Sequence, residues 1–190
     1  MPGSENPKIR AAAVGDARAI AEIQVRAWQE GYRGILPEHL LQGLSVEMRA
    51  STWAERIEAG SSIIVAEAHE MVAGWIFFGP SRDRDAVPGE GEIYAIYVAP
   101  DRWSRGIGRG LWEEARRVFR AGCYRVVSLW VFQANVRARR FYERLGFAEE
   151  PGARKLFERD GATAPEVRYR QAIEGASVDT PLKRTDSGGG

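Results

Sequence analysis

The chain has 190 residues, of which 44% are hydrophobic and 28% are charged, and its formal net charge is +1. These values are typical of one ordinary globular domain. A single cysteine excludes an internal disulfide, and two histidines are too few to favour a metal site. The apolar runs are much shorter than the roughly 20 residues that span a bilayer. The polar start lacks a secretory signal, so we expect a cytoplasmic protein.

Charge is unevenly distributed along the chain. Residues 115–142 contain no Asp or Glu but seven arginines, including Arg137 and Arg139, so this segment should attract anions. The near-neutral overall charge and the absence of a recognised nucleic-acid motif favour a phosphorylated small ligand over nucleic acid.

The first half of the chain predicts two helices and a β-hairpin. Residues 8–13 predict a short strand, and Asp16 is placed to cap a helix with an apolar stripe. Ser45 is placed to begin a second helix. Two β-rich runs, 62–68 and 71–78, are separated by two residues and therefore predict an antiparallel hairpin.

The second half predicts strands that alternate with helices. Residues 79–91 are rich in glycine, proline and acids, which predicts a mobile acidic loop suited to a cationic substrate. The runs 92–98 and 125–132 predict strands, and the helices 109–121 and 135–145 follow them. These elements predict a mixed sheet in a layered α/β fold.

The domain organisation follows from composition. We expect a flexible N-terminus at residues 1–7, a single domain at residues 8–173 and a disordered tail at residues 174–190, which ends in Ser-Gly-Gly-Gly. No internal repeat of solenoid length is present. The architecture narrows the function without settling it.

A glycine-rich loop connects a predicted strand to a predicted helix. Its residues are Arg105, Gly106, Ile107, Gly108, Arg109 and Gly110. Backbone N–H groups of such a loop can converge on an anion at the helix N-terminus, although similar turns also occur only for tight packing. A dinucleotide-binding fingerprint needs glycine where Leu111 stands, and a nucleotide-triphosphate loop needs a lysine that is missing here. Both of these cofactor classes are therefore disfavoured.

Two motifs occur in order in the second half. The first is Trp103-Ser104-Arg105-Gly106-Ile107-Gly108, and the second is the segment 135–147, Asn-Val-Arg-Ala-Arg-Arg-Phe-Tyr-Glu-Arg-Leu-Gly-Phe. In both motifs the chain resembles the GCN5-related N-acetyltransferase (GNAT) family, over about residues 9–170. The family writes its pyrophosphate loop with Gln or Arg where Trp103 stands, so side-chain contacts at that position should differ.

The resemblance implies the GNAT acyl-CoA N-acyltransferase fold, in which helices flank a central, mixed and mostly antiparallel sheet. It implies acetyl-CoA as cosubstrate, no metal and direct transfer without a covalent acyl-enzyme. Pantetheine should lie in a wedge between the strands 92–98 and 125–132, and the acceptor should enter from the opposite side. The residues expected to contact the acyl carrier are Tyr97, Val98, Trp103, Ser104, Arg105, Gly106, Ile107, Gly108, Arg109, Gly110, Asn135 and Arg139.

Tyr142 is the candidate general acid. It stands seven residues after Asn135, about two helical turns, so both should share one helix face. The resemblance implies that Tyr142 protonates the departing CoA thiolate, which suits a phenol with an ordinary pKa near 10. A packed core tyrosine is the alternative. Asn135 should cap its helix and also touch the pantetheine arm.

Glu92 is the candidate general base. It stands fourteen residues before Gly106, which is the offset of the catalytic glutamate in histone-type members of the family. A lysine-like amine must lose a proton before it can attack a thioester. A solvated carboxylate at a strand end is the alternative, because many members use water chains or other positions. Val131 stands where some members carry another glutamate.

The acceptor is the least determined part of the reaction. The segment 27–37 resembles polyamine and other small-molecule members, and its Trp28 and Tyr32 are candidate walls for a cationic acceptor, with core packing as the alternative. We expect acetyl transfer to an amine of a small molecule, such as a polyamine or amino compound. A protein N-terminal or lysine acetyltransferase and a non-catalytic acyl-CoA sensor are the alternatives. We expect no nucleic-acid or membrane partner, and the sequence leaves a homodimer open.

Overall fold

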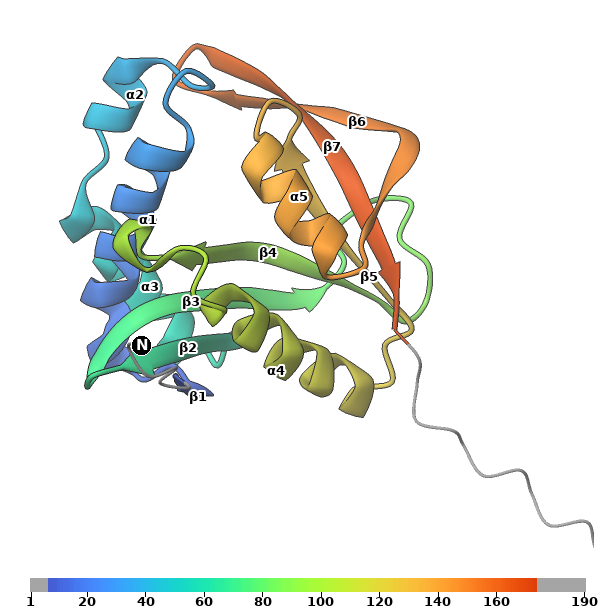
Figure 1. Cartoon of the computed structure of the whole chain (residues 1–190), viewed down its shortest axis with the longest axis horizontal. Helices are drawn as coiled ribbons and strands as arrows, with labels where there is room; N and C mark the ends of the chain where they lie inside the picture. Colours follow the sequence, from blue (N-terminus) through green and yellow to red (C-terminus); the bar gives the residue numbers. More distant parts are fainter. Residues whose placement is uncertain (1–6, 174–190) are drawn as a thin grey trace, which may run out of the picture.

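The computed structural model describes residues 7–173 (Figure 1). The expected C-terminal tail and nearly all of the expected flexible N-terminus lie outside these residues. The elements are, in order, β1 (Lys8–Ala11), the 3-10 turn η1 (Val14–Asp16), α1 (Ala17–Gly31), α2 (Glu38–Gln42), α3 (Val46–Glu58), β2 (Ile63–Ala68), β3 (Met71–Pro80), β4 (Glu90–Val98), the 3-10 turn η2 (Pro100–Arg102), α4 (Ile107–Ala121), β5 (Val126–Phe132), α5 (Val136–Arg144), β6 (Ala148–Arg159) and β7 (Ala162–Ala172).

The described strands form one seven-stranded sheet in the order β1-β2-β3-β4-β5-β7-β6. Every neighbouring pair is antiparallel except β4 and β5, which are parallel and joined through α4. A parallel pair requires such a crossover, whereas hairpins join the antiparallel neighbours β2–β3 and β6–β7. The expected mixed, mostly antiparallel sheet flanked by helices is confirmed.

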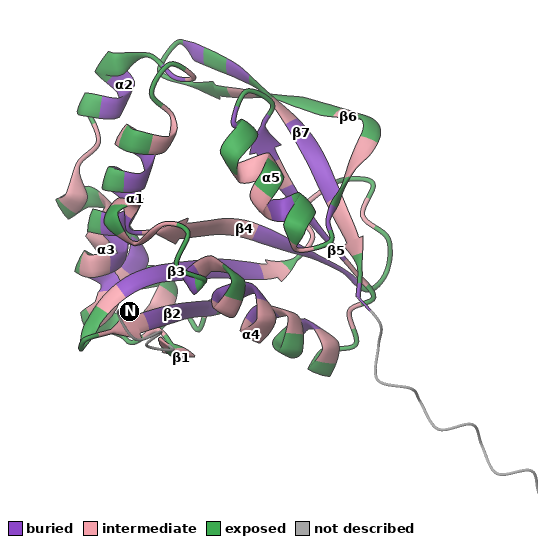
Figure 2. Ribbon diagram, in the orientation of Figure 1, coloured by how far each residue is buried: buried purple, intermediate pink, exposed green. Residues whose placement is uncertain are grey.

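Two apolar cores lie on opposite faces of the sheet. On one face α4 buries Leu111, Trp112 and Phe119 against the central strands, because these residues recur at helical spacing. On the other face α1 and α3 pack against β2 and β3, where Trp53 contacts Trp75 with ring centroids 4.6 Å apart. Figure 2 shows that the central strands are largely buried, whereas β6 at the sheet edge is largely exposed.

Local signals gave the starts of α1 and α3, with one difference in chemistry, whereas α4 begins two residues before the predicted helix. The Ser45 hydroxyl accepts from the backbone N–H of Met48 at 3.2 Å, so this cap is confirmed. Asp16 precedes α1 as expected, but its carboxylate does not cap that helix. It accepts instead from the backbone N–H of Ala13 and from Arg10, because the intervening 3-10 turn directs it backward.

Candidate active site

The strands β4 and β5 separate after a short parallel ladder. Pairing joins residues 90–93 of β4 to residues 126–129 of β5 and then ends. A register shift in the β3–β4 ladder leaves Tyr94 as an extra residue, and such a bulge bends its strand. We call the diverging segments, 94–98 and 130–132, the fork. Figure 1 shows β4 and β5 side by side at one end and apart at the other.

Backbone groups of β4 face the fork at Val98. The Ala99 N–H donates to the Ala73 carbonyl of β3 at 2.9 Å, and antiparallel ladders alternate, so the N–H and C=O of Val98 point away from β3. The Val98 carbonyl accepts from the indole N–H of Trp103 at 2.8 Å. By the same alternation, the backbone of Tyr97 faces β3. Of these two residues, only Val98 therefore offers its backbone to a ligand in the fork.

The N-terminus of α4 lies at the start of the glycine-rich loop. Gly106 is the N-cap with φ +84°, no side chain caps the helix, and its first turn has no acidic residue. The first backbone N–H groups of a helix have no intrahelical partner, which here concerns Ile107, Gly108 and Arg109. A Cβ on Gly106 would meet nothing within 4 Å, so this position is open as well as left-handed. These features fit an anion such as pyrophosphate.

The other residues of the loop have different roles. A Cβ on Gly108 would lie 3.0 Å from Cζ of Phe141, so this glycine allows α4 to approach α5 closely. The Gly110 N–H is already bonded within the helix. Ser104, which has φ +62°, and Arg105 are exposed.

Trp103 also contacts α5. The Arg137 guanidinium carbon lies 3.2 Å from the centroid of the Trp103 ring, a cation–π contact. Burial lowers the pKa of Arg137. A Cβ on Gly31 would lie 3.1 Å from Nη2 of Arg137, so the guanidinium also touches the end of α1. The substitution of Trp103 for the family's Gln or Arg thus builds an aromatic contact between η2 and α5.

The two motif residues of the α5 region are both buried. Asn135 caps α5, because its Oδ1 accepts from the backbone N–H of Ala138 at 3.1 Å, as expected. Tyr142 packs near Phe147 and Tyr169, with ring centroids 6.0 and 6.5 Å away. Within residues 7–173, no hydrogen bond engages the Tyr142 hydroxyl. Burial raises the pKa of Tyr142, so the group stays protonated and free to donate.

An aromatic cluster closes the fork on the face opposite α5. The indole N–H of Trp28 donates to the Tyr97 hydroxyl at 2.8 Å, and the Tyr32 hydroxyl lies 3.2 Å from that of Tyr97. The Tyr32 ring meets Phe132 of β5 edge to face at 4.8 Å. Tyr32 therefore bridges both arms of the fork. Burial raises the pKa of both tyrosines, so they remain neutral.

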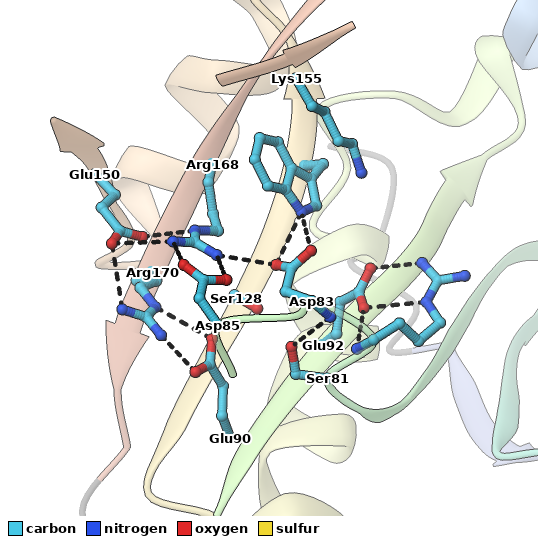
Figure 3. A network of polar contacts seen from close by, with 12 residues as sticks. Ser81, Asp83, Asp85, Glu90, Glu92, Ser128, Glu150, Lys155, Arg168 and Arg170 are labelled. Carbon is cyan, nitrogen blue, oxygen red and sulfur yellow. Dashed lines mark hydrogen bonds and ion pairs between the residues drawn. The ribbon is translucent and has the colours of Figure 1, made fainter. Parts of the chain in front are cut away.

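Glu92 lies on β4 before the strands separate, opposite Ser128. It is only 2% exposed. Its carboxylate accepts three hydrogen bonds from Arg82, one from the backbone N–H and two from the guanidinium, at 2.5 to 3.0 Å (Figure 3). The charge of Glu92 is therefore balanced within the protein.

The loop at residues 79–91 was expected to present its acidic charge to a substrate. This expectation is wrong for its two aspartates, Asp83 and Asp85. Asp83 and Asp85 bind the guanidinium of Arg168, which is 5% exposed, and Asp83 also accepts from the indole of Trp130 (Figure 3). Glu150 of β6 binds the same arginine at 2.7 Å. The loop is thereby fastened to β5 and β7, and both aspartates are engaged by a guanidinium of the protein itself.

Arg139 makes its hydrogen bonds to residues outside the α4 N-terminus. Its guanidinium donates to the Tyr169 hydroxyl at 3.0 Å, the Gln133 carbonyl at 3.2 Å and Glu149 at 2.9 Å. These bonds fasten α5 to the sheet, so the Arg139 guanidinium is already engaged within the protein.

Sequence reasoning missed Glu166 of β7, which pairs with Phe132 at the end of the fork. Its carboxylate lies 3.6 Å from Lys155. Burial raises the pKa of Glu166, and the charge of Glu92 raises it further, whereas Lys155 lowers it. No sequence signal marked Glu166 as different from the other acids of the chain.

An uncapped helix N-terminus beside two diverging parallel strands can hold the phosphate of a ligand that extends between the strands. The chain belongs to the acetyltransferase (GNAT) family, whose model matches residues 19–147. It is therefore an acyl-CoA-dependent N-acetyltransferase.

Individual proteins show the same similarity. The chain is 29% identical over 160 residues to the uncharacterized N-acetyltransferase YuaI of Bacillus subtilis, covering 84% of this chain and 89% of that protein. Its fold matches a ribosomal-protein-alanine N-acetyltransferase from Brucella melitensis with a TM-score of 0.69 at 22% identity, covering 87% and 99%. It also matches yncA, a putative acetyltransferase from Salmonella typhimurium with its cofactor acetyl-CoA, with a TM-score of 0.68 at 21% identity, covering 93% and 99%.

Within residues 7–173, every helix is too short or too polar to span a lipid bilayer. Nor does that part of the chain contain a group of three or more His, Cys, Asp or Glu side chains placed to hold a metal ion.

Proposed function

We propose that this enzyme transfers the acetyl group of acetyl-CoA directly to an amine of a small molecule. The observation that carries the proposal is the closure of the fork by Tyr32, whose ring contacts Phe132 and whose hydroxyl meets that of Tyr97. An acceptor that reaches the fork from this face must therefore fit beside a packed aromatic cluster.

The surrounding packing supports the same conclusion. Trp28 and the α1–α2 connection share one apolar core with the β6–β7 hairpin, which contributes Phe157 and Ala162. Trp28 and Phe157 have ring centroids 6.3 Å apart. Segments from both ends of the chain thus enclose the end of the fork. A site walled by packed aromatic side chains favours a small ligand over a folded protein surface.

The reaction forms an N–C bond and breaks the C–S bond of the thioester. The free amides at the start of α4 are placed to hold the pyrophosphate, and the Val98 N–H is placed to pair with the pantetheine arm. Tyr142 donates its proton to the departing sulfur, and the nitrogen of the tetrahedral intermediate returns a proton to Tyr142 as the amide forms. Glu92 accepts the proton that the ammonium loses, through a water, because Arg82 already occupies the carboxylate.

An acceptor screen tests the proposal. The purified enzyme is supplied with acetyl-CoA and a panel of polyamines, amino acids, amino sugars and peptides, and thiol release is followed together with the mass of the product. We expect turnover of at least one small amine and only background rates with peptides. Acetylation of peptide N-termini or lysines alone would support a protein acetyltransferase instead. Binding of acetyl-CoA without turnover of any amine would indicate a sensor.

A further inference from the structure

A half-buried arginine on the acceptor side of the fork has no role in the proposed chemistry. Arg49 of α3 places its guanidinium carbon 5.0 Å from the centroid of the Trp28 ring. Its Nη2 is buried and has no hydrogen-bond partner within residues 7–173. Burial lowers the pKa of Arg49. Because a buried donor without a partner is costly, such a group calls for an acceptor atom that binds there.

A second arginine reinforces this positive charge. The guanidinium carbon of Arg159, at the end of β6, lies 5.9 Å from the same Trp28 ring. Its own acidic neighbour is Asp160, at 3.6 Å. The charge of Arg159 lowers the pKa of Arg49 further, so the two cations repel each other. The Trp28 ring is therefore already occupied by cations, which disfavours the expected use of Trp28 to bind a cationic acceptor.

A carboxylate stands beside the same cluster, because Glu166 pairs across the ladder with Phe132, whose ring meets Tyr32 at 4.8 Å. Glu166 is half-buried, and its one basic partner in an ion pair within residues 7–173 is Lys155. Burial raises the pKa of the Tyr97 hydroxyl, the charge of Arg49 lowers it and the charge of Glu166 raises it. Both charges therefore act on the hydroxyl that Trp28 holds at the fork.

We infer that the acceptor is an amino-acid-type zwitterion, whose anionic group binds Arg49 with the help of Arg159 and whose ammonium group binds Glu166. This inference rests on the proposed function, because it assigns the substrate class of the same site. A carboxylate is the simplest anion that fits, since arginine binds it through paired hydrogen bonds. The amine then lies between its carboxylate partner and the fork, where the thioester carbonyl is delivered.

A double comparison of enzyme and substrate tests the inference. A free amino acid that the wild-type enzyme acetylates is compared with its carboxamide, and both are measured with wild type and Arg49→Gln. We expect wild type to prefer the acid by about 10- to 100-fold in kcat/KM, mostly through KM, which corresponds to one charge-assisted interaction. Arg49→Gln should lose that preference, so that the ratio of kcat/KM for the acid to kcat/KM for the carboxamide falls toward one. Arg49→Lys should keep part of the preference.

Arg56→Gln is the matched control. Arg56 lies on the same helix and also covers aromatic rings, 5.4 Å from Trp53 and 5.1 Å from Phe77, but it is far along the helix from Trp28. Arg56→Gln should leave the ratio of kcat/KM for the acid to kcat/KM for the carboxamide unchanged. Calorimetry with acetyl-CoA should give the same affinity for wild type and Arg49→Gln.

The outcomes separate the two proposals. If wild type acetylates polyamines or carboxamides but prefers them over zwitterions, the inference fails and the proposed function stands. A preference for the acid that survives in Arg49→Gln also overturns the inference. If acetyl-CoA binds and no amine of any kind is acetylated, the proposed function fails and the inference fails with it. Should Arg49→Gln not fold, the wild-type ratio and Arg49→Lys decide.

Discussion

At the level of single residues, the Tyr142 hydroxyl has no hydrogen-bond partner within residues 7–173, whereas the Tyr142 ring packs against other aromatic rings. Tyr142→Phe removes the proton donor but keeps the contacts with Phe147 and Tyr169. We expect kcat to fall by about 10²-fold, with little change in acetyl-CoA affinity or melting temperature. Steady-state kinetics, calorimetry and thermal unfolding check the three quantities. Wild-type turnover in this variant would make Tyr142 a packing residue only.

The role of Glu92 as general base can be tested with Glu90, a second buried glutamate of β4, as the control. Glu92→Gln keeps the shape but cannot accept a proton, so kcat/KM should fall by about 10²-fold or more and recover partly at high pH, where free amine is abundant. Glu90→Gln is the control, because Glu90 is also buried on β4 and also pairs with an arginine, Arg170. It should cost similar stability and leave the pH–rate profile unchanged. Identical profiles for both variants would remove Glu92 from the mechanism.

The residues that sequence could assign are those whose partners are close in the chain. Asn135 caps the residue three positions later, and the loop around Gly106 needs only its own backbone. Arg49 and Glu166 gain their significance from segments that fold together from distant parts of the sequence. Even the Trp28–Tyr97 hydrogen bond joins residues 69 positions apart. No local pattern encodes such a contact.

At the scale of elements, the start of α4 depends on one left-handed residue. An alanine at Gly106, where φ is +84°, should cost about 1–2 kcal/mol of stability or shift the loop. A shifted loop misplaces the free amides, so we expect Kd for acetyl-CoA to rise by about 10-fold, measured by calorimetry. Gly60→Ala is the control, since Gly60 has φ +75° and equally open surroundings after α3. It should lower stability similarly and leave acetyl-CoA affinity unchanged.

The loop between β3 and β4 should make stability sensitive to acid. The Arg168 side chain lowers the pKa of Asp85 from 3.8 to about 2. Because the folded-state pKa is depressed, this contribution is complete above the unfolded pKa and is lost as pH falls toward about 2. Urea unfolding of wild type and Asp85→Asn should therefore give a difference that is constant near neutrality and shrinks below about pH 4. A difference independent of pH would contradict the role of this ion pair.

Periodicity and turn residues gave most of the elements, including the β2–β3 hairpin and the strands of the fork. They missed α2, which is too short for a helical period, and β6, which contains Pro151 and Gly152 and many charges. β6 forms because β7 provides its hydrogen-bond partners, over a ladder that is interrupted between Glu149 and Arg154. Its existence depends on a neighbour rather than on its own propensity.

At the scale of the whole molecule, acetyl-CoA should stabilise the fold. A ligand that binds only the native state adds RT ln(1 + [L]/Kd), about 2.7 kcal/mol at a concentration of 100 Kd. For a chain of this size that corresponds to a rise in melting temperature of roughly 5–11 °C. Thermal unfolding with acetyl-CoA, CoA and longer acyl-CoAs measures it, and ATP serves as the control for a general anion effect. The absence of any shift or calorimetric binding would contradict the assignment of the fork and the α4 N-terminus.

The exposed strand β6 has a consequence for how molecules of this protein meet in solution. A strand at the edge of a sheet offers unpaired backbone groups to other chains, and a long flat one invites aggregation. β6 has twelve residues, but Pro151 lacks a backbone N–H, the register breaks beside it, and charged side chains such as Lys155 and Glu158 flank the rest. These features oppose the joining of two sheets edge to edge. The strand that carries Arg159 is thus also built against edge-to-edge pairing with a second copy of the sheet.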